Sequence, residues 1–368
     1  MMTNRREILA AVTASALPAS VSAKSLTQPV RHRRIATEEA FAIPEWLDAM
    51  KQVPMEGPEA NEVRFLRFVQ SVEAWRQGLI DFPHRLAVMD EHGVDLHLLS
   101  LTTPGVQSFE PDEASRVARL VNDSLAEIIA RHTGRFAGLA TVAPQQPEAA
   151  AAELERAVTK LGLNGLLINS YTNDEYLDLP KFDPILATAA RLGAPLYIHP
   201  RTPSPSMVRP YSDHGLIGAL WGFAADTGLH AMRLIMSGVF DRHPDLQVVL
   251  GHMGEGIPYW FWRIDNMYNK YNGLGAGAAI GIKPLRQLPS AYFKTNIRMT
   301  TSGMNSHENL RFAINLLGAE RIMFAIDFPY ESTAQSVQFL DTAPITEDER
   351  AQIYHRTAEA VFRIAPAT

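Results

Sequence analysis

The strongest constraint on the fold is an alternation of eight short, apolar, β-rich runs with longer segments of helical character. This pattern is typical of repeated βα units, and eight of them predict a closed (β/α)8 barrel. Helices are expected over 111–133, 147–161 and 183–192, each followed by a glycine that can end it: Gly134, Gly162 and Gly193. The eight runs are 34–41, 95–101, 136–142, 165–170, 195–200, 247–254, 293–299 and 321–329.

An open doubly wound sheet is the competing architecture, and the sequence argues against it. Such folds usually carry a glycine-rich phosphate loop after their first strand, and none follows the first run here. Residues 43–84 are too long for a simple connection. We therefore expect a single barrel domain over 34–368, with 43–84 as an insertion that caps its mouth.

Composition narrows the function. Hydrophobic residues make up 46% of the 368-residue chain, which is ample for a large core. The formal charge of −6, without a basic stripe, argues against a nucleic-acid partner. The chain has no cysteine, which excludes disulfides and thiolate metal sites and leaves histidine and carboxylate as the metal ligands.

The first residues have the features of an export signal. Arg5 and Arg6 precede a weakly apolar stretch, and Ala23 ends a small-x-small cleavage site. We interpret 1–23 as a twin-arginine signal peptide and 24–33 as a linker. The expected location is periplasmic, or cytoplasmic if the signal is not functional. No other apolar stretch is long enough to span a membrane.

Ionisable residues fall at the ends of several predicted strands, where a barrel gathers its active site. Taken singly, each has a structural explanation: His199 as a core histidine, Asp327 as a helix cap, Glu38 as half of a surface pair. Together they predict a converging site with a shared cation, because charges in apolar strands are costly to bury without a partner. The candidates are Glu38 and Glu39 (first strand), His199 (fifth), His252 and Glu255 (sixth) and Asp327 (eighth).

Five sequence motifs resemble the aromatic-acid decarboxylases of the amidohydrolase superfamily. The resemblance is strongest to the 5-carboxyvanillate decarboxylases, with the 2,3-dihydroxybenzoate and γ-resorcylate decarboxylases nearby. It implies Glu38, His199 and Asp327 as ligands of one divalent metal ion, with Mn²⁺ favoured and Zn²⁺ possible. Ala40 stands where many relatives carry a second histidine ligand. The motifs are 34–41 (RIATEEAF), 101–107 (LTTPGVQ), 141–145 (TVAPQ), 197–200 (YIHP) and 251–255 (GHMGE).

The resemblance also implies a reaction: non-oxidative loss of CO₂ from an ortho-hydroxylated benzoic acid. Asp327 is expected to protonate the ring carbon, with His252 and Glu255 as an adjacent charge or proton relay. The resemblance further suggests a homo-oligomer.

For substrate binding the resemblance implies Arg263, Tyr330 and Thr102. Each has an alternative: Arg263 could pair with Asp265 or Glu255, and Thr102 could be a turn residue. Arg64 and Arg67 in the insertion could clamp the mouth, although this segment departs from the family pattern.

Two other functions are compatible with parts of this pattern. A metal-dependent hydrolase of the same superfamily, such as a lactonase, would use the same ligands. A non-catalytic protein on a degenerate barrel would be expected to have lost one of them, and none is lost.

Overall fold

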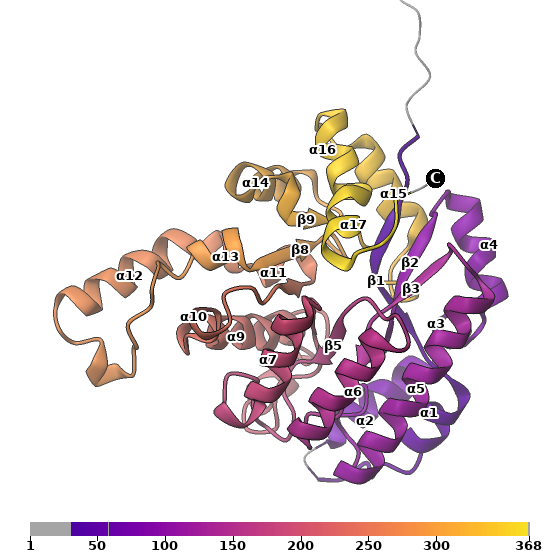
Figure 1. Ribbon diagram of the computed structural model, residues 1–368, viewed down its shortest axis with the longest axis horizontal. Coiled ribbons are helices and arrows are strands. Elements are labelled where there is room, and N and C mark those ends of the chain that lie inside the picture. The colour runs from indigo at the N-terminus through magenta and orange to yellow at the C-terminus, as the bar shows by residue number, and fades with distance from the viewer. Residues whose placement is uncertain (1–30, 58, 367–368) are drawn as a thin grey trace, which may run out of the picture. The chain divides into compact units, whose positions relative to one another are not determined.

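The computed structural model describes residues 31–57 and 59–366. The predicted signal peptide and most of the linker lie outside the described residues. Residues 32–368 form one compact unit, in which parallel strands are surrounded by helices (Figure 1). The strands are β1 (Ile35–Phe41), β2 (Leu96–Leu101), β3 (Phe136–Gly138), β4 (Ala140–Thr141), β5 (Leu166–Asn169), β6 (Leu196–His199), β7 (Val248–Leu250), β8 (Ile297–Thr300) and β9 (Ile322–Met323).

The strands pair in two parallel series, β1-β2-β3 and β4 through β9. Leu139 joins the two series, because its N–H donates to Leu99 O (2.8 Å) between β3 and β4. At the other end, the chain after β9 pairs with β1: Thr37 N–H donates to Phe324 O (3.1 Å) and Ala40 N–H to Phe328 O (2.8 Å). β3 and β4 are two parts of one barrel strand interrupted at Leu139, so the nine labelled strands close into the predicted eight-stranded barrel.

The helices cover the outer face of this ring. Helix α7 shows why they end where they do: Gly193, its C-cap, has φ 57°, a conformation that glycine adopts at little cost. The helices after the insertion are α5 (Pro111–Arg131), α6 (Pro147–Thr159), α7 (Asp183–Leu192), α8 (Arg209–Ser212), α9 (Gly222–Met236), α10 (Val239–Arg242), α11 (His252–Glu255), α12 (Phe261–Gly273), α13 (Ala291–Thr295), α14 (His307–Leu317), α15 (Thr333–Thr342), α16 (Glu347–Ala351) and α17 (Thr357–Phe362).

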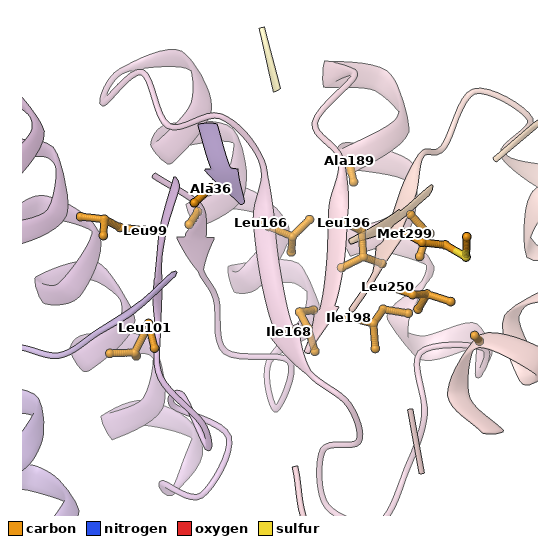
Figure 2. Close-up of a cluster of buried hydrophobic side chains, with 14 of the residues drawn as sticks. Ala36, Leu99, Leu101, Leu166, Ile168, Ala189, Leu196, Ile198, Leu250 and Met299 are labelled. Atoms are coloured by element: carbon orange, nitrogen blue, oxygen red, sulfur yellow. The ribbon is translucent and has the colours of Figure 1, made fainter. Parts of the chain in front are cut away.

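The core between strands and helices is built by alternate strand residues. Leu166 and Ile168 of β5, and Leu196 and Ile198 of β6, point to the same side as Ala189 of α7 (Figure 2). The intervening residues point into the barrel, where they form a second buried cluster. This alternation places every second residue at a strand's end toward the barrel interior.

Three predicted strands are partly wrong. The eighth run (321–329) is a strand only over β9, although Phe324 and Phe328 beyond it still pair with β1. The sixth run (247–254) is a strand only as far as Leu250, because the next residues turn sharply. The seventh run (293–299) begins as helix α13, and β8 starts at Ile297. Phe293 packs its ring 4.8 Å from that of Phe261, so its apolar character serves helix packing. Periodicity cannot separate helix from strand over so short a run.

The predicted insertion (43–84) forms three helices, α1 (Pro44–Met50), α2 (Ala60–Ser71) and α3 (Glu73–Ile80), and the start of a fourth, α4 (Phe82–His92), which continues past the predicted end. Glu62 of α2 is buried and ties the insertion to the loops at the carboxyl ends of the strands. It accepts hydrogen bonds from Thr103 Oγ1 (2.9 Å) and Thr202 N–H (2.8 Å). Arg201 is buried beside it and pairs with Glu59 and Glu62. None of the helices in the described ranges is long and apolar enough to span a bilayer.

Candidate metal centre and active site

Three of the predicted residues converge at the carboxyl ends of the strands. Glu38 extends from β1, His199 ends β6, and Asp327 follows β9, and one ligand atom from each lies within 4.8 Å of the others. Ligand bonds of about 2.1 Å place the atoms around a cation no more than about 4.2 Å apart. A small inward movement therefore suffices for these residues to hold a metal ion.

Glu38 presents one free carboxylate oxygen to this group. Its Oε2 accepts hydrogen bonds from the hydroxyls of Tyr197, Thr300 and Ser302, that of Thr300 at 3.0 Å. Its Oε1 is buried, has no hydrogen-bond partner among the described residues, and lies 3.7 Å from His199 Nε2. A buried oxygen without a partner is costly unless a cation binds it.

Electrostatics keep Glu38 in its charged form. Burial alone would raise the pKa of its carboxyl group, but the imidazoles of His252 and His199 and the hydroxyl donors lower this pKa below its usual range. The negative charge of the deprotonated carboxylate favours binding of a cation, so this environment suits the role.

His199 is oriented by its own backbone. Its Nδ1 lies 2.8 Å from Pro200 O, a carbonyl that can only accept, so Nδ1 carries the proton. The lone pair is then on Nε2, which faces Glu38. A ligating histidine commonly donates its other ring N–H to such an acceptor.

The turn after β7 places His252 and Glu255 beside the three candidate ligands. Five consecutive residues from His252 to Gly256 have positive φ values between 51° and 75°. Such a left-handed run is unfavourable for residues other than glycine and is characteristic of functional sites. It replaces the strand that the sequence predicted here.

The imidazole of His252 bridges Glu255 and the ligand group. Its Nδ1 lies 3.0 Å from Glu255 Oε1, and its Nε2 lies 3.7 Å from Asp327 Oδ2. Burial alone would lower the pKa of His252, but the carboxylates of Glu255 and Glu38 and the interaction with Asp327 raise it well above its usual range. This arrangement can hold a proton next to Asp327.

Two of the three predicted substrate residues meet. Thr102 Oγ1 and Tyr330 OH share a hydrogen bond of 2.5 Å. Trp75 of α3 packs edge-on against the Tyr330 ring with centroids 5.8 Å apart, so the insertion reaches this point.

Arg263 lies elsewhere in the chain. It is exposed on α12, and no contact among the described residues joins it to the metal ligands. Its predicted alternative partner Asp265 instead accepts from Ser290 Oγ (2.6 Å). Arg64 and Arg67 are also exposed, and both donate to Met55, Arg64 to its carbonyl oxygen and Arg67 to its sulfur.

Sequence reasoning missed several supporting residues. Nothing in the sequence marks Tyr197, Thr300 and Ser302 as residues whose hydroxyls bind Glu38. Tyr197, however, precedes His199 by two positions and therefore lies on the same face of the strand. That spacing is the one signal that could have found it.

Comparison with known proteins agrees with this geometry. Residues 73–364 match the family described as amidohydrolase, and the chain belongs to it. The γ-resorcylate decarboxylase of Rhodococcus jostii (strain RHA1) is 38% identical over 346 residues, spanning 90% of this chain and 98% of that protein.

Solved structures are also similar. The 5-carboxyvanillate decarboxylase of Sphingomonas paucimobilis has a TM-score of 0.87 at 45% identity, covering 91% of this chain and 100% of that one. The corresponding enzyme of Novosphingobium aromaticivorans DSM 12444, with manganese and 4-hydroxy-3-methoxy-5-nitrobenzoic acid, has a TM-score of 0.85 at 36% identity, covering 90% of this chain and 96% of that one.

Proposed function

We propose that the protein catalyses metal-dependent, non-oxidative decarboxylation of an ortho-hydroxylated benzoic acid. The observation that carries this proposal is the unpaired Oε1 of Glu38, facing His199 and Asp327, with His252 directly alongside. Similar proteins named as decarboxylases of hydroxylated benzoic acids, including one with bound manganese, support the choice of reaction and of Mn²⁺.

Glu38, His199 and Asp327 would hold the metal ion. When bound, it supplies a positive charge that orients the carboxylate and the ortho oxygen of the substrate and favours the phenolate. Two carboxylates and one imidazole suit Mn²⁺, with Zn²⁺ as the alternative. Thr102 and Tyr330 support binding of the ring substituents, because their hydroxyls already meet at one point.

Asp327 is the proposed acid. It donates a proton to the ring carbon that bears the carboxylate, which interrupts the aromatic system. The bond to the carboxylate then breaks, CO₂ leaves, and the electron pair of that bond restores aromaticity. His252, held by Glu255 at 3.0 Å, returns a proton to Asp327 for the next turnover.

The test is a CO₂-release assay on Mn²⁺-loaded protein without residues 1–23, using a panel of ortho-hydroxybenzoates that includes 5-carboxyvanillate. Release that is lost on chelation and restored by Mn²⁺ is expected. No release from any member, in protein with one metal ion per chain, would overturn the proposal in favour of a hydrolase. The prediction for Arg263 stays a prediction, to be checked by the KM of Arg263→Ala.

We also propose that the protein assembles as a homo-oligomer. Three aromatic residues just before or at the start of α12 are largely exposed: Tyr259 at 79%, Trp260 at 57% and Trp262 at 76%. A second copy would bury such a patch. Light scattering should show a multiple of the chain mass that Trp262→Glu reduces, and a wild-type monomer would contradict this.

Export by the twin-arginine route is a further proposal, resting on Arg5, Arg6 and the small residues before Ala23. The protein expressed with residues 1–23 should be recovered from the periplasm. Replacement of both arginines by lysine should retain it in the cytoplasm, and equal export of both forms would contradict the proposal.

A further inference from the structure

Glu39, next to the proposed ligand Glu38, forms hydrogen bonds with the backbone on both sides of Asp327. Its carboxylate is completely buried. Its Oε1 accepts from Ile326 N–H at 2.9 Å and its Oε2 accepts from Phe328 N–H at 3.1 Å. Both oxygens therefore accept from the N–H groups of the two residues that flank the proposed acid, and Glu39 is not one of the three residues whose ligand atoms converge.

The backbone of Asp327 needs such support. Its φ is 74°, in the left-handed region that residues other than glycine rarely adopt. Its own N–H donates to Glu38 O at 3.1 Å, and its carbonyl accepts from Tyr330 N–H at 2.8 Å. In the described part of the chain, Glu39 is the residue whose side chain forms hydrogen bonds with the backbone of 326–328. The other hydrogen bonds of this backbone there are made with backbone groups.

A buried cation accompanies this carboxylate. Arg85 of α4 is fully buried, and its guanidinium carbon lies 4.6 Å from the centre of the Phe328 ring. It donates to Ala40 O and, at 2.8 Å, to Gly78 O. Burial raises the pKa of Glu39 above its ordinary value, although the two N–H donors and the charge of Arg85 act to lower it.

We propose that Glu39 is a positioning residue: it fixes the peptide groups around Asp327 and so sets the orientation of the proposed acid and metal ligand, with Arg85 as its buried counter-charge. This inference rests on the proposed function, because orienting Asp327 affects catalysis only if Asp327 belongs to the metal centre. Residues that orient metal ligands typically change metal affinity or activity by about 10- to 100-fold when altered.

The experiment compares Glu39→Gln, Glu39→Asp and Thr37→Val with the wild-type protein. Glutamine keeps the size of the side chain but turns an NH₂ group toward one of the two backbone donors. Aspartate keeps the charge but is too short to reach both. Thr37 is a matched control, because it is equally buried on β1 and its hydroxyl donates to Phe324 O at 2.9 Å, away from Asp327.

The readouts are Mn²⁺ affinity by calorimetry, the electron paramagnetic resonance spectrum of bound Mn²⁺, and kcat and KM. For Glu39→Gln we expect Mn²⁺ affinity about tenfold or more weaker, an altered spectrum and a kcat reduced more than KM is changed. Glu39→Asp should lie between it and the wild type. Thr37→Val should lower thermal stability and leave affinity, spectrum and kcat unchanged.

A folded Glu39→Gln protein with wild-type affinity, spectrum and kcat would overturn the inference, even if its thermal stability fell. If Glu39→Gln does not fold, the same criterion applies to Glu39→Asp: wild-type affinity, spectrum and kcat would overturn the inference. Failure of the wild-type protein to bind Mn²⁺ at all would instead overturn the proposed function. The two failures are therefore distinguishable.

Discussion

The Cα of Gly251 lies so close to the carboxylate of Glu38 that no side chain fits between them. A Cβ at this position would stand 2.9 Å from Oε2 and 3.0 Å from Oε1 of Glu38. The φ of Gly251 is −68°, which any residue adopts, so glycine is required here by proximity and not by backbone conformation.

We therefore expect Gly251→Ala to fold normally but to bind Mn²⁺ at least about tenfold more weakly, because the methyl group displaces a ligand carboxylate. Calorimetric titration of metal-free protein measures this. Gly273→Ala is the control, since a Cβ there meets nothing within 4 Å. Equal affinities of the two variants would show that Glu38 is not a ligand.

Asp327→Asn should abolish turnover. The amide cannot donate the proton that the ring carbon needs, and it is a poorer metal ligand than a carboxylate. CO₂ release from Mn²⁺-loaded variant protein measures the effect, with the metal content of the sample determined in parallel. Retained wild-type activity would rule out Asp327 as the acid.

Tyr330→Phe should weaken substrate binding. It removes a hydroxyl that shares a hydrogen bond with Thr102, and a hydrogen bond of this kind contributes about 1 kcal/mol. We expect KM to rise about fivefold and kcat to change less. Tyr354→Phe is the comparison, because that hydroxyl bonds to Asp341 at 2.7 Å, outside the site. The prediction fails if both variants have wild-type KM.

Arg201→Met should destabilise the fold. Arg201 is fully buried with Glu62, whose side chain is 1% exposed, and losing the cation leaves that charge unpaired. Breaking such a pair costs about 3–5 kcal/mol. Arg356→Met, which removes an exposed pair with Asp348, should cost less than about 1 kcal/mol. Urea unfolding provides both values, and similar values would contradict the prediction.

His230 should make stability depend on pH. Burial, helped by Arg233, lowers the pKa of this histidine to about 3, against 6.5 for an ordinary histidine. Its Nε2 accepts from Leu177 N–H at 3.2 Å, which protonation would prevent. Between pH 3 and pH 6.5 the unfolded chain therefore binds more protons at this histidine than the folded protein does. The contribution of His230 leaves stability unaffected above pH 6.5 and lowers it as the pH falls below 6.5.

The expected loss from His230 between pH 6.5 and pH 5 is about 2 kcal/mol in the free energy of unfolding. Urea unfolding of metal-free protein at several pH values measures it, which keeps metal release out of the result. His230→Gln should show a shallower fall than the wild type over this range. Parallel curves for the two proteins would assign the acid sensitivity to other groups.

The sequence contained enough to bring the candidate ligands together but not to identify the residues that support them. His199 and Asp327 stand out because they interrupt apolar strands at equivalent ends, which is a one-dimensional signal. Glu38 and Glu39 are adjacent carboxylates, and the register of β1 against β2 shifts between Ala36 and Glu39. Alternation along a strand therefore could not decide which of the two faces the metal.

Other parts of the site depend on conformation that no local pattern specifies. The only sequence sign of the left-handed run from His252 to Gly256 is that three of the six residues in 251–256 are glycine. The proposed role of Arg85 required knowing that α4 brings its guanidinium against Ala40, Gly78 and Phe328. Arg263 was predicted from resemblance alone, and its exposure on α12 could not be anticipated from its neighbours.

The barrel closes by pairing β1 with the segment after β9, and this seam carries Glu38 and Asp327. During synthesis the ribosome makes Glu38 long before Asp327. A nascent or truncated chain that stops before residue 327 therefore lacks both a candidate ligand and the segment that pairs with β1. Metal retention would then distinguish chains that extend past residue 327 from shorter ones.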